Sequence, residues 1–193
     1  MLKNKFKKKT MAAIKPIIKK GIFALVLVII AVSFYYLTIW ITPYYVQSKF
    51  AEKSLGYVNT PRFGDQPNAE NSRVIPLPNP DFLYSTINYD LKDNVLKISG
   101  IVPDSTYWSI SAYQENTTNY FVENEEQVKS KFEYYLAEEG SKSEVLKNIP
   151  KEKIIYSPTT KGLILFRYLV SKAYPVKQLS GLQHGVSVVK LVK

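Results

Sequence analysis

The stretch DFLYSTINYDL, residues 81–91, decides the fold of this 193-residue chain. One side of this segment is mostly apolar and the other mostly polar: Leu83, Ser85, Ile87, Tyr89 and Leu91 fall on the first, and Tyr84, Thr86, Asn88 and Asp90 on the second. Alternation with a period of two is typical of a β-strand that has one buried and one solvated face. We therefore expect a strand here, packed by its apolar face against a core.

Similar signals predict a series of further strands. Asp93-Asn94 is typical of a hairpin tip, so we expect the chain to return through a strand that contains Leu96 and Ile98. Residues 163–170 form an apolar run that is too short to cross a membrane as a helix, which predicts a central strand covered on both faces. Other strands are expected at residues 107–113, with Trp108, Ile110 and Ala112 inward, and at residues 120–122 and 186–192.

Two short helices are expected between these strands. The first begins at the capping residue Asn124 and ends at Gly140, because the apolar residues between them recur at helical spacing. The second follows the capping-box pattern of residues 141–144 and stops at Pro150. Because strands dominate, the predicted fold class is mainly β, a β-sandwich-like exported domain with one or two short helices, and α+β is the alternative.

A single transmembrane helix is expected before this domain. Residues 21–41 carry no charge, and about 20 residues at ~1.5 Å each cross the ~30 Å hydrocarbon layer once. Pro43 is expected to end that helix. The predicted organisation is a cytoplasmic lysine-rich tail (1–20), a transmembrane helix (21–42), a tether and entry segment (43–80) and a β-rich exported domain (81–193).

The charge is distributed unevenly along the chain. The formal net charge is +10, and residues 1–20 contain eight lysines and no acid. Lysines on the amino side of an apolar segment favour a cytoplasmic N-terminus, which places the domain in the periplasm or otherwise outside the inner (plasma) membrane. The lipid bilayer is therefore an expected partner. Nucleic acid is not, because the remaining 18 Lys and Arg nearly balance the 16 Asp and Glu.

Two questions stay open at the N-terminus. Ala31-Val32-Ser33 places small residues at the spacing of a cleavage site, so a cleaved secretory signal is the alternative to an uncleaved anchor. The lysines either set topology alone or also bind anionic lipid headgroups or nucleic acid. In both cases of the first question the main domain is exported.

The composition excludes several kinds of chemistry. The chain has no Cys and a single histidine, His184, so it has no disulfide, thiol nucleophile or cysteine-ligated metal, and we expect no metal or other cofactor. His184 lies between Gln183 and Gly185, and we expect a surface or hydrogen-bonded turn residue, with a catalytic base as the alternative. The sequence favours a non-enzymatic role and leaves catalysis open.

Arg167 lies inside the apolar run of residues 163–170. Burying a lone guanidinium is costly, so we expect either a buried ion pair with Asp81 or Asp90, or a cleft in which Arg167 binds an anionic ligand. Tyrosines and asparagines on polar strand faces and loops form a second set: Tyr84, Tyr107, Tyr113, Asn88, Asn116 and Asn119.

Such a Tyr/Asn set either lines a ligand-binding groove, or hydrates one face of a sheet or forms a protein interface. The candidate ligand-binding residues are Asn79, Asp81, Tyr84, Tyr107, Tyr113, Asn116 and Arg167.

Several of these residues belong to a longer pattern. Asn79-Pro80-Asp81-Phe82-Leu83-Tyr84-Ser85, Val102-Pro103-Asp104, residues 107–113 and the later arginine-bearing strand together resemble the bacterial domain-of-unknown-function family twelve-fifty-four, whose short members look like integral membrane proteins. The likeness covers about residues 70–190, and Phe82 stands where a threonine is expected. The resemblance implies a β-sandwich in the bacterial envelope and brings no established activity. Members joined to a companion domain are longer than this chain.

Three functional hypotheses follow. The leading one is a single-span envelope protein whose exported domain is a non-catalytic binding or interaction module, with an envelope protein as a partner. The second is a membrane-tethered enzyme or ligand-binding protein that uses Asp81, Tyr84 and Arg167 on a polar or anionic envelope molecule. The third is an accessory subunit of a membrane complex.

Overall fold

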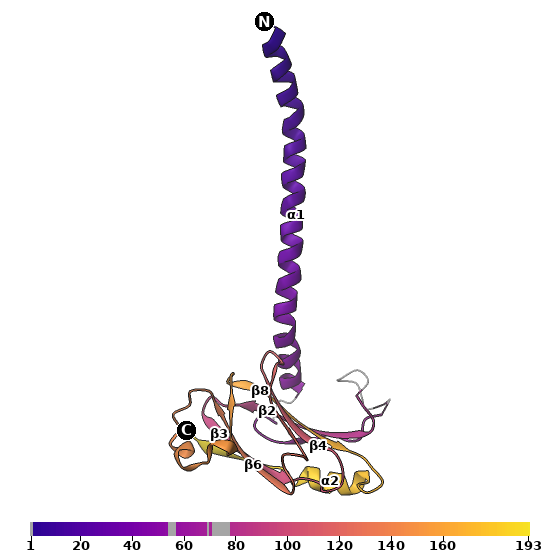
Figure 1. Cartoon of the computed structure of the whole chain (residues 1–193), viewed down its shortest axis with the longest axis vertical. Coiled ribbons are helices and arrows are strands. Elements are labelled where there is room, and N and C mark those ends of the chain that lie inside the picture. Colours follow the sequence, from indigo (N-terminus) through magenta and orange to yellow (C-terminus); the bar gives the residue numbers. More distant parts are fainter. Residues whose placement is uncertain (1, 54–56, 69, 71–77) are drawn as a thin grey trace. The chain divides into compact units, whose positions relative to one another are not determined.

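The computed structural model describes residues 2–53, 57–68, 70 and 78–193. The chain forms two compact units, Met1–Pro43 and Tyr44–Lys193. The first unit is helical and the second is built mainly of strands (Figure 1). The mainly-β fold class is therefore confirmed.

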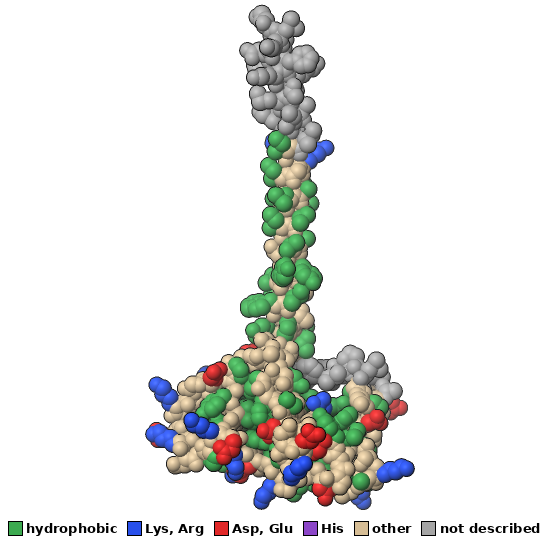
Figure 2. Space-filling view, viewed as in Figure 1, with side chains coloured by type: hydrophobic (Ala, Val, Ile, Leu, Met, Phe, Trp, Pro, Cys, Tyr) green, Lys and Arg blue, Asp and Glu red, His purple; other side chains and the backbone are tan. Residues whose placement is uncertain are grey.

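The helix α1 (Leu2–Lys53) contains the apolar segment Ile18–Lys49, which is long and apolar enough to cross a membrane once. Its large apolar side chains between Ile22 and Ile41 are all at least 45% exposed, and they cover the helix surface seen in Figure 2. A helix that is apolar all round has no polar face to turn to water, which is typical of a membrane span.

The expected end of this helix at Pro43 is wrong, because α1 continues to Lys53. A proline removes one backbone donor from the helical ladder, so the Ile39 carbonyl loses its usual partner, but the helix continues through this position. Thr42 Oγ1 donates to the Thr38 carbonyl oxygen at 2.7 Å, and Thr38 Oγ1 donates to the Phe34 carbonyl oxygen at 2.8 Å.

Two sheets make up the second unit (Figure 1). The five-stranded sheet is antiparallel, in the order β1 (Arg62–Phe63), β2 (Phe82–Asp90), β8 (Lys161–Leu169), β4 (Trp108–Gln114) and β5 (Asn119–Asn124). The four-stranded sheet has the order β7 (Ile154–Ser157), β6 (Lys131–Glu138), β3 (Asn94–Ile101) and β9 (Ser187–Val192), with β7 parallel to β6.

The inner faces of the two sheets share one hydrophobic core. Trp108 of β4 stacks on Phe132 of β6 with ring centroids 5.2 Å apart, which joins the sheets directly. The alternation predicted for residues 81–91 is confirmed, since Leu83, Ile87 and Leu91 are all buried. The inward positions expected on β4 are also confirmed.

The helix expected between Asn124 and Gly140 is wrong. Residues 131–138 form strand β6, which pairs with β3. The apolar positions fit both periods, and pairing with β3 decides in favour of the strand by burying Phe132, Tyr134 and Leu136 in the core. Asn124 starts a turn, where its Oδ1 accepts a hydrogen bond from the Glu126 amide at 2.9 Å.

Three smaller expectations need correction. Asp93-Asn94 is no hairpin tip, because β2 and β3 belong to different sheets and the connection crosses between them. The segment after Ser143 is a short 3₁₀ helix, η1 (Glu144–Asn148), without a side-chain cap. β8 is central, as expected, but only its inner face is buried, and its outer face is half-buried.

Two further elements, besides η1, belong to the second unit. The 3₁₀ turn η2 (Lys151–Lys153) precedes β7, and the helix α2 (Val176–His184) precedes β9. The sequence did not predict α2. Its buried Gln183 donates through Nε2 to the Tyr84 and Gly64 carbonyl oxygens, at 2.8 and 3.1 Å. These two bonds fix α2 to β2 and to the residue that follows β1.

Candidate functional site

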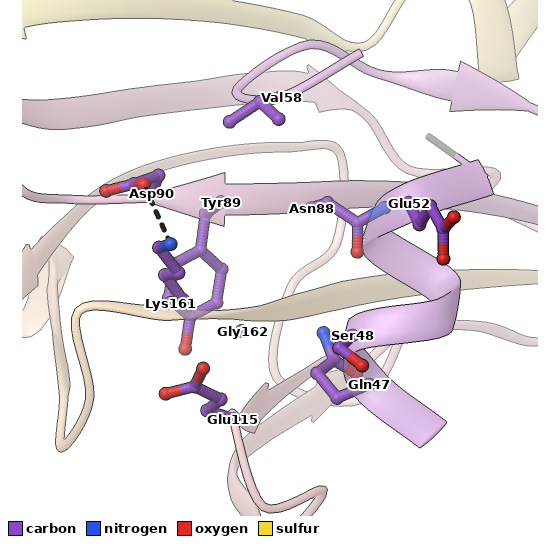
Figure 3. A pocket seen from close by; sticks show the side chains of 10 residues that line it. All are labelled: Gln47, Ser48, Glu52, Val58, Asn88, Tyr89, Asp90, Glu115, Lys161 and Gly162. Atoms are coloured by element: carbon purple, nitrogen blue, oxygen red, sulfur yellow. Dashed lines mark ion pairs between the residues drawn. The ribbon is translucent and has the colours of Figure 1, made fainter. Parts of the chain in front are cut away.

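A cavity of about 350 Å³ opens at one end of the five-stranded sheet, and we call it the Asn88 pocket (Figure 3). All of its lining residues belong to the unit Tyr44–Lys193. They come from the last turns of α1, the segment before β1, the end of β2, the β4–β5 turn and the start of β8. The lining residues are Gln47, Ser48, Glu52, Val58, Asn88, Tyr89, Asp90, Glu115, Lys161 and Gly162.

Asn59 closes the edge of β2 beside this pocket. Its backbone amide donates to the Asn88 carbonyl oxygen at 2.8 Å, and its side-chain amide bonds both the carbonyl oxygen and the backbone amide of Asp90, at 2.8 and 2.7 Å. Asn59 has a φ of 57°, a left-handed conformation that asparagine tolerates better than most residues. One residue thus acts as a strand partner for β2 and holds Asn88 and Asp90 in place.

Asn88 contributes an unpaired acceptor to the pocket. Its side chain projects from the outer face of β2, yet the residue is only 6% exposed, and its Oδ1 has no hydrogen-bond donor in the described part of the chain. The amide points into the space between β2 and the end of α1 (Figure 3). An unsatisfied buried acceptor costs about 1–3 kcal/mol, and this one lies in the wall of a pocket whose lining surface is mostly apolar.

The charges around the pocket are only partly balanced. Lys161 Nζ lies 3.7 Å from Asp90 Oδ2, and Lys49 Nζ lies 2.6 Å from Glu52 Oε2. Glu115 is half-buried and forms no ion pair within the described residues. Its position is fixed by its backbone amide, which donates to Thr159 Oγ1 at 3.1 Å. The lining therefore carries one uncompensated negative charge.

A cluster of hydroxyl groups lies next to the pocket, between the two sheets. The Tyr89 hydroxyl accepts a hydrogen bond from Tyr120 at 3.1 Å and lies 2.8 Å from Ser157 Oγ. Burial raises the pKa of Tyr89 and Tyr120 above that of an exposed tyrosine, so both stay neutral. A Cβ atom at Gly162 would lie 2.2 Å from the Tyr89 oxygen, and only glycine leaves room for this arrangement.

Arg167 does not form the expected ion pair. Its Nε donates to Ser109 Oγ at 3.0 Å, and no carboxylate of the described residues pairs with it. Asp90 pairs with Lys161 instead. Arg167 lies on the half-buried outer face of β8. Its guanidinium can be hydrated there, so it does not require a carboxylate partner. Its role as a ligand-binding residue stays a prediction.

The structure brings only some of the candidate residues together. Tyr84 is the cross-strand partner of Arg167, and Tyr107 packs edge-on against Phe82 with centroids 5.8 Å apart. Tyr113 is on the same face but opposite Leu163. That places it four residues further along β8, about 13 Å from the Arg167 position. Tyr84 and Arg167 are therefore neighbours, Tyr113 lies apart from them, and a shared ligand groove stays a prediction.

The candidate asparagines outside β2 serve turns and strand ends. Asn79 Oδ1 accepts a hydrogen bond from the Asp81 amide at 2.9 Å, and Asn116 Oδ1 accepts one from the Thr118 amide at 3.0 Å. Asn119 donates to the Ala112 carbonyl oxygen at 3.1 Å. Asp81 itself is exposed, and its carbonyl oxygen accepts the Val170 amide. These bonds account for the asparagines as local structure.

His184 is the last residue of α2 and is exposed, which agrees with the surface position expected for it. Its ring packs against Phe63 with centroids 4.4 Å apart, and its Nδ1 lies 2.7 Å from the Ser180 carbonyl oxygen. Across the described segments, no group of three or more His, Asp or Glu side chains is arranged to hold a metal ion.

Comparison with known proteins decides the family. The model of the family described as protein of unknown function, DUF1254, matches residues 58–190, well over half of the chain. The chain belongs to this family. The resemblance seen in the sequence is confirmed, and the family's description carries no activity. No curated protein matches the sequence.

One solved structure supports the fold, and a second is reported beside it. The crystal structure of the VPA0106 protein from Vibrio parahaemolyticus matches 79% of this chain with a TM-score of 0.57 at 12% sequence identity. An uncharacterised protein from Burkholderia cenocepacia matches 83% with a TM-score of 0.49 at 14% identity. The matches cover 36% and 42% of those solved chains, so this chain spans less than half of their length.

Proposed function

We propose that this protein is a single-span envelope protein whose β-sandwich is a non-catalytic binding module, holding a small polar ligand in the Asn88 pocket. The lysine-rich N-terminus lies in the cytoplasm, and the sandwich lies outside the membrane. The apolar segment of α1 and the concentration of lysines before it support this topology.

The unpaired Oδ1 of Asn88 carries the proposal. A buried acceptor without a donor destabilises the ligand-free protein, and a ligand that supplies a donor removes that cost on binding. The pocket volume of about 350 Å³ lies at the small end of the range of roughly 300–1,000 Å³ that ligand sites occupy. The pocket therefore suits a small molecule rather than a peptide.

The groups around the pocket favour binding over catalysis. The neighbouring tyrosine hydroxyls are neutral because burial raises their pKa, so neither supplies a base or a nucleophile at neutral pH. The imidazole of His184 is engaged by α2 and by Phe63. Asp81, Tyr84 and Arg167, which an enzyme was expected to use, do not line the Asn88 pocket.

The test compares two substitutions on β2. Asn88→Leu removes the unpaired acceptor at similar volume, and Ser85→Ala removes a second buried unpaired oxygen that lies on the opposite face of the strand. Small polar molecules are screened by ligand-observed NMR against the full chain in detergent. Binding that survives in Ser85→Ala and disappears in Asn88→Leu supports the proposal. Binding that Asn88→Leu leaves unchanged contradicts it.

A second candidate function is an accessory subunit of a membrane complex. Its support is the apolar segment of α1, which would hold the chain in the same bilayer as such a complex. A larger protein that co-purifies after extraction in mild detergent would support this candidate. A clean monomer at the same detergent concentration would count against it.

A further inference from the structure

One wall of the Asn88 pocket is made by the helix that carries the apolar segment. Gln47 and Ser48 of α1 line the pocket, and the exposed residues Tyr44 and Tyr45 precede them in the same helix. All four residues lie within Ile18–Lys49, the segment that is long and apolar enough to cross a membrane. Tyrosine rings favour the boundary between lipid and water, and Gln47 follows Tyr44 by less than one helical turn of about 5.4 Å. In the proposed topology, this wall therefore lies at the level of the lipid headgroups.

The lining of the pocket combines a mostly apolar surface with one enclosed acceptor. Val58 contributes an aliphatic side chain to the lining. The Asn88 Oδ1 in the wall has no hydrogen-bond donor among the described residues, and Asn88 is buried. A ligand that matches both features has an apolar part and an O–H or N–H donor at one end. Membrane lipids are built in this way, and the bilayer supplies them at this level.

The charges of the lining favour a donor that is itself uncharged. Glu115 forms no ion pair within the described residues, so it would repel a phosphate or carboxylate head. An ammonium head would lose its water at a mostly apolar wall, and Glu115 lies on the other side of the pocket from Asn88 (Figure 3). A hydroxyl group donates one hydrogen bond to the Asn88 oxygen without bringing a charge into the pocket.

We propose that the polar group held in the Asn88 pocket is the uncharged hydroxyl head of a lipid from the outer leaflet; this rests on the proposed function, that the pocket binds a polar ligand. The hydroxyl donates to the Asn88 Oδ1, and the part of the lipid next to the head packs against Val58. The cavity of about 350 Å³ lies at the small end of the range for ligand sites. It therefore holds the head, and the remainder of the chain stays in the bilayer.

Three matched probes test this proposal on the full chain in nanodiscs of phosphatidylcholine, a lipid without any O–H or N–H donor. Monooleoylglycerol carries a hydroxyl head and a chain, its 2,3-di-O-methyl ether carries the chain without a donor, and glycerol carries the donors without a chain. A ligand that binds the folded state raises its melting temperature. Monooleoylglycerol should raise that of the sandwich by about 2 °C or more, and the ether and glycerol at the same total concentration by much less. Equal shifts for monooleoylglycerol and its ether overturn the proposal.

Two pairs of variants locate the contact, each compared with its own melting temperature without ligand. Asn88→Leu should lose the shift that monooleoylglycerol produces, and Ser85→Ala, on the opposite face of β2, should keep it. Val58→Asp places a charge where the apolar part of the lipid packs and should also lose the shift, although the backbone bridge from Val58 to Asn88 remains. Val122→Asp, at an exposed position of β5 outside the lining, is its matched control and should keep the shift. A shift that survives in Asn88→Leu or in Val58→Asp overturns the proposal.

The glycerol probe separates the failure of this proposal from the failure of the proposed function. If glycerol raises the melting temperature through Asn88 and monooleoylglycerol gives no larger shift, the lipid proposal fails and the binding function stands. If no probe gives a shift that depends on Asn88, the lipid proposal fails. The binding function fails with it when the screen of small polar molecules by NMR is also negative.

Discussion

Replacing Asn88 by leucine should stabilise the ligand-free protein while removing the proposed ligand binding. Asn88 is 6% exposed and its Oδ1 has no hydrogen-bond partner. The wild-type protein therefore contains a desolvated acceptor at this position that the Asn88→Leu variant does not have. Removing such a group recovers about 1–3 kcal/mol. Allowing for imperfect packing of the branched side chain, we expect a gain in the free energy of unfolding of about 1 kcal/mol.

The gain should be visible as a rise in melting temperature. For a domain of this size, 1 kcal/mol corresponds to about 2–4 °C. The backbone carbonyl of Asn88, which accepts the Asn59 amide, is retained in the variant, so the wall of the pocket stays in place. Thermal unfolding of the full chain, followed by the far-ultraviolet circular dichroism of the sandwich, gives the shift.

Ser85→Ala is the control, because Ser85 is equally buried and its Oγ is also unpaired. It should raise the melting temperature by a similar amount and leave ligand binding intact. The reasoning is refuted if Asn88→Leu lowers the melting temperature by several degrees, since that would show that the amide stabilises the fold. A residue that weakens the fold and is needed for binding is the pattern expected of a site maintained for function.

Three further predictions concern packing, pH and topology. Gly162→Ala should lower the free energy of unfolding by about 1–3 kcal/mol, because its new methyl group would overlap the Tyr89 oxygen, whereas Gly181→Ala, in open space on α2, should raise it by about 0.5–1 kcal/mol in urea titrations. Burial raises the pKa of Tyr89, so stability is complete below the ordinary tyrosine pKa near 10 and falls as the pH rises above it; a Tyr89→Phe variant should show a flatter pH dependence of its urea midpoint between pH 9 and 11. Alkaline carbonate should leave the full chain in the membrane pellet, and protease added outside the cell should digest the sandwich; a full-length soluble chain would exclude the proposed anchor.

The sequence predicted a strand correctly where the spacing of its apolar residues fits a strand and does not fit a helix. Residues 82–90 alternate in burial except at Asn88, and the inner face that they predict is buried. The prediction for residues 131–138 was wrong because Phe132, Tyr135 and Leu136 also recur at helical spacing. In addition, the acidic residues after Asn124 resemble the first turn of a helix. Hydrogen bonding to β3 resolves the ambiguity, and that strand lies far away in the sequence.

The same non-local dependence explains why Pro43 and Arg167 misled the prediction. A proline removes only one hydrogen bond from the helical ladder, and the rest of the ladder carries α1 through Pro43 to Lys53. An arginine in an apolar run predicts a buried ion pair only if both faces of the strand are covered. Sheet position leaves the outer face of β8 half-buried, so the guanidinium needs no carboxylate.

The Asn88 pocket could not be predicted from the sequence, although the sequence did indicate Asn88 as a residue on a polar strand face. The alternation placed Asn88 on the polar face of its strand, where an amide is expected to be solvated. It is buried because Asn59 and the end of α1 reach it from elsewhere in the chain, and no local pattern encodes either approach. The three consecutive buried residues Ile87, Asn88 and Tyr89 interrupt the alternation of β2. Asn88 is a polar residue that the strand pattern places in solvent and that the tertiary structure buries. This unexpected burial is the physical basis for proposing that this end of the sheet binds a ligand.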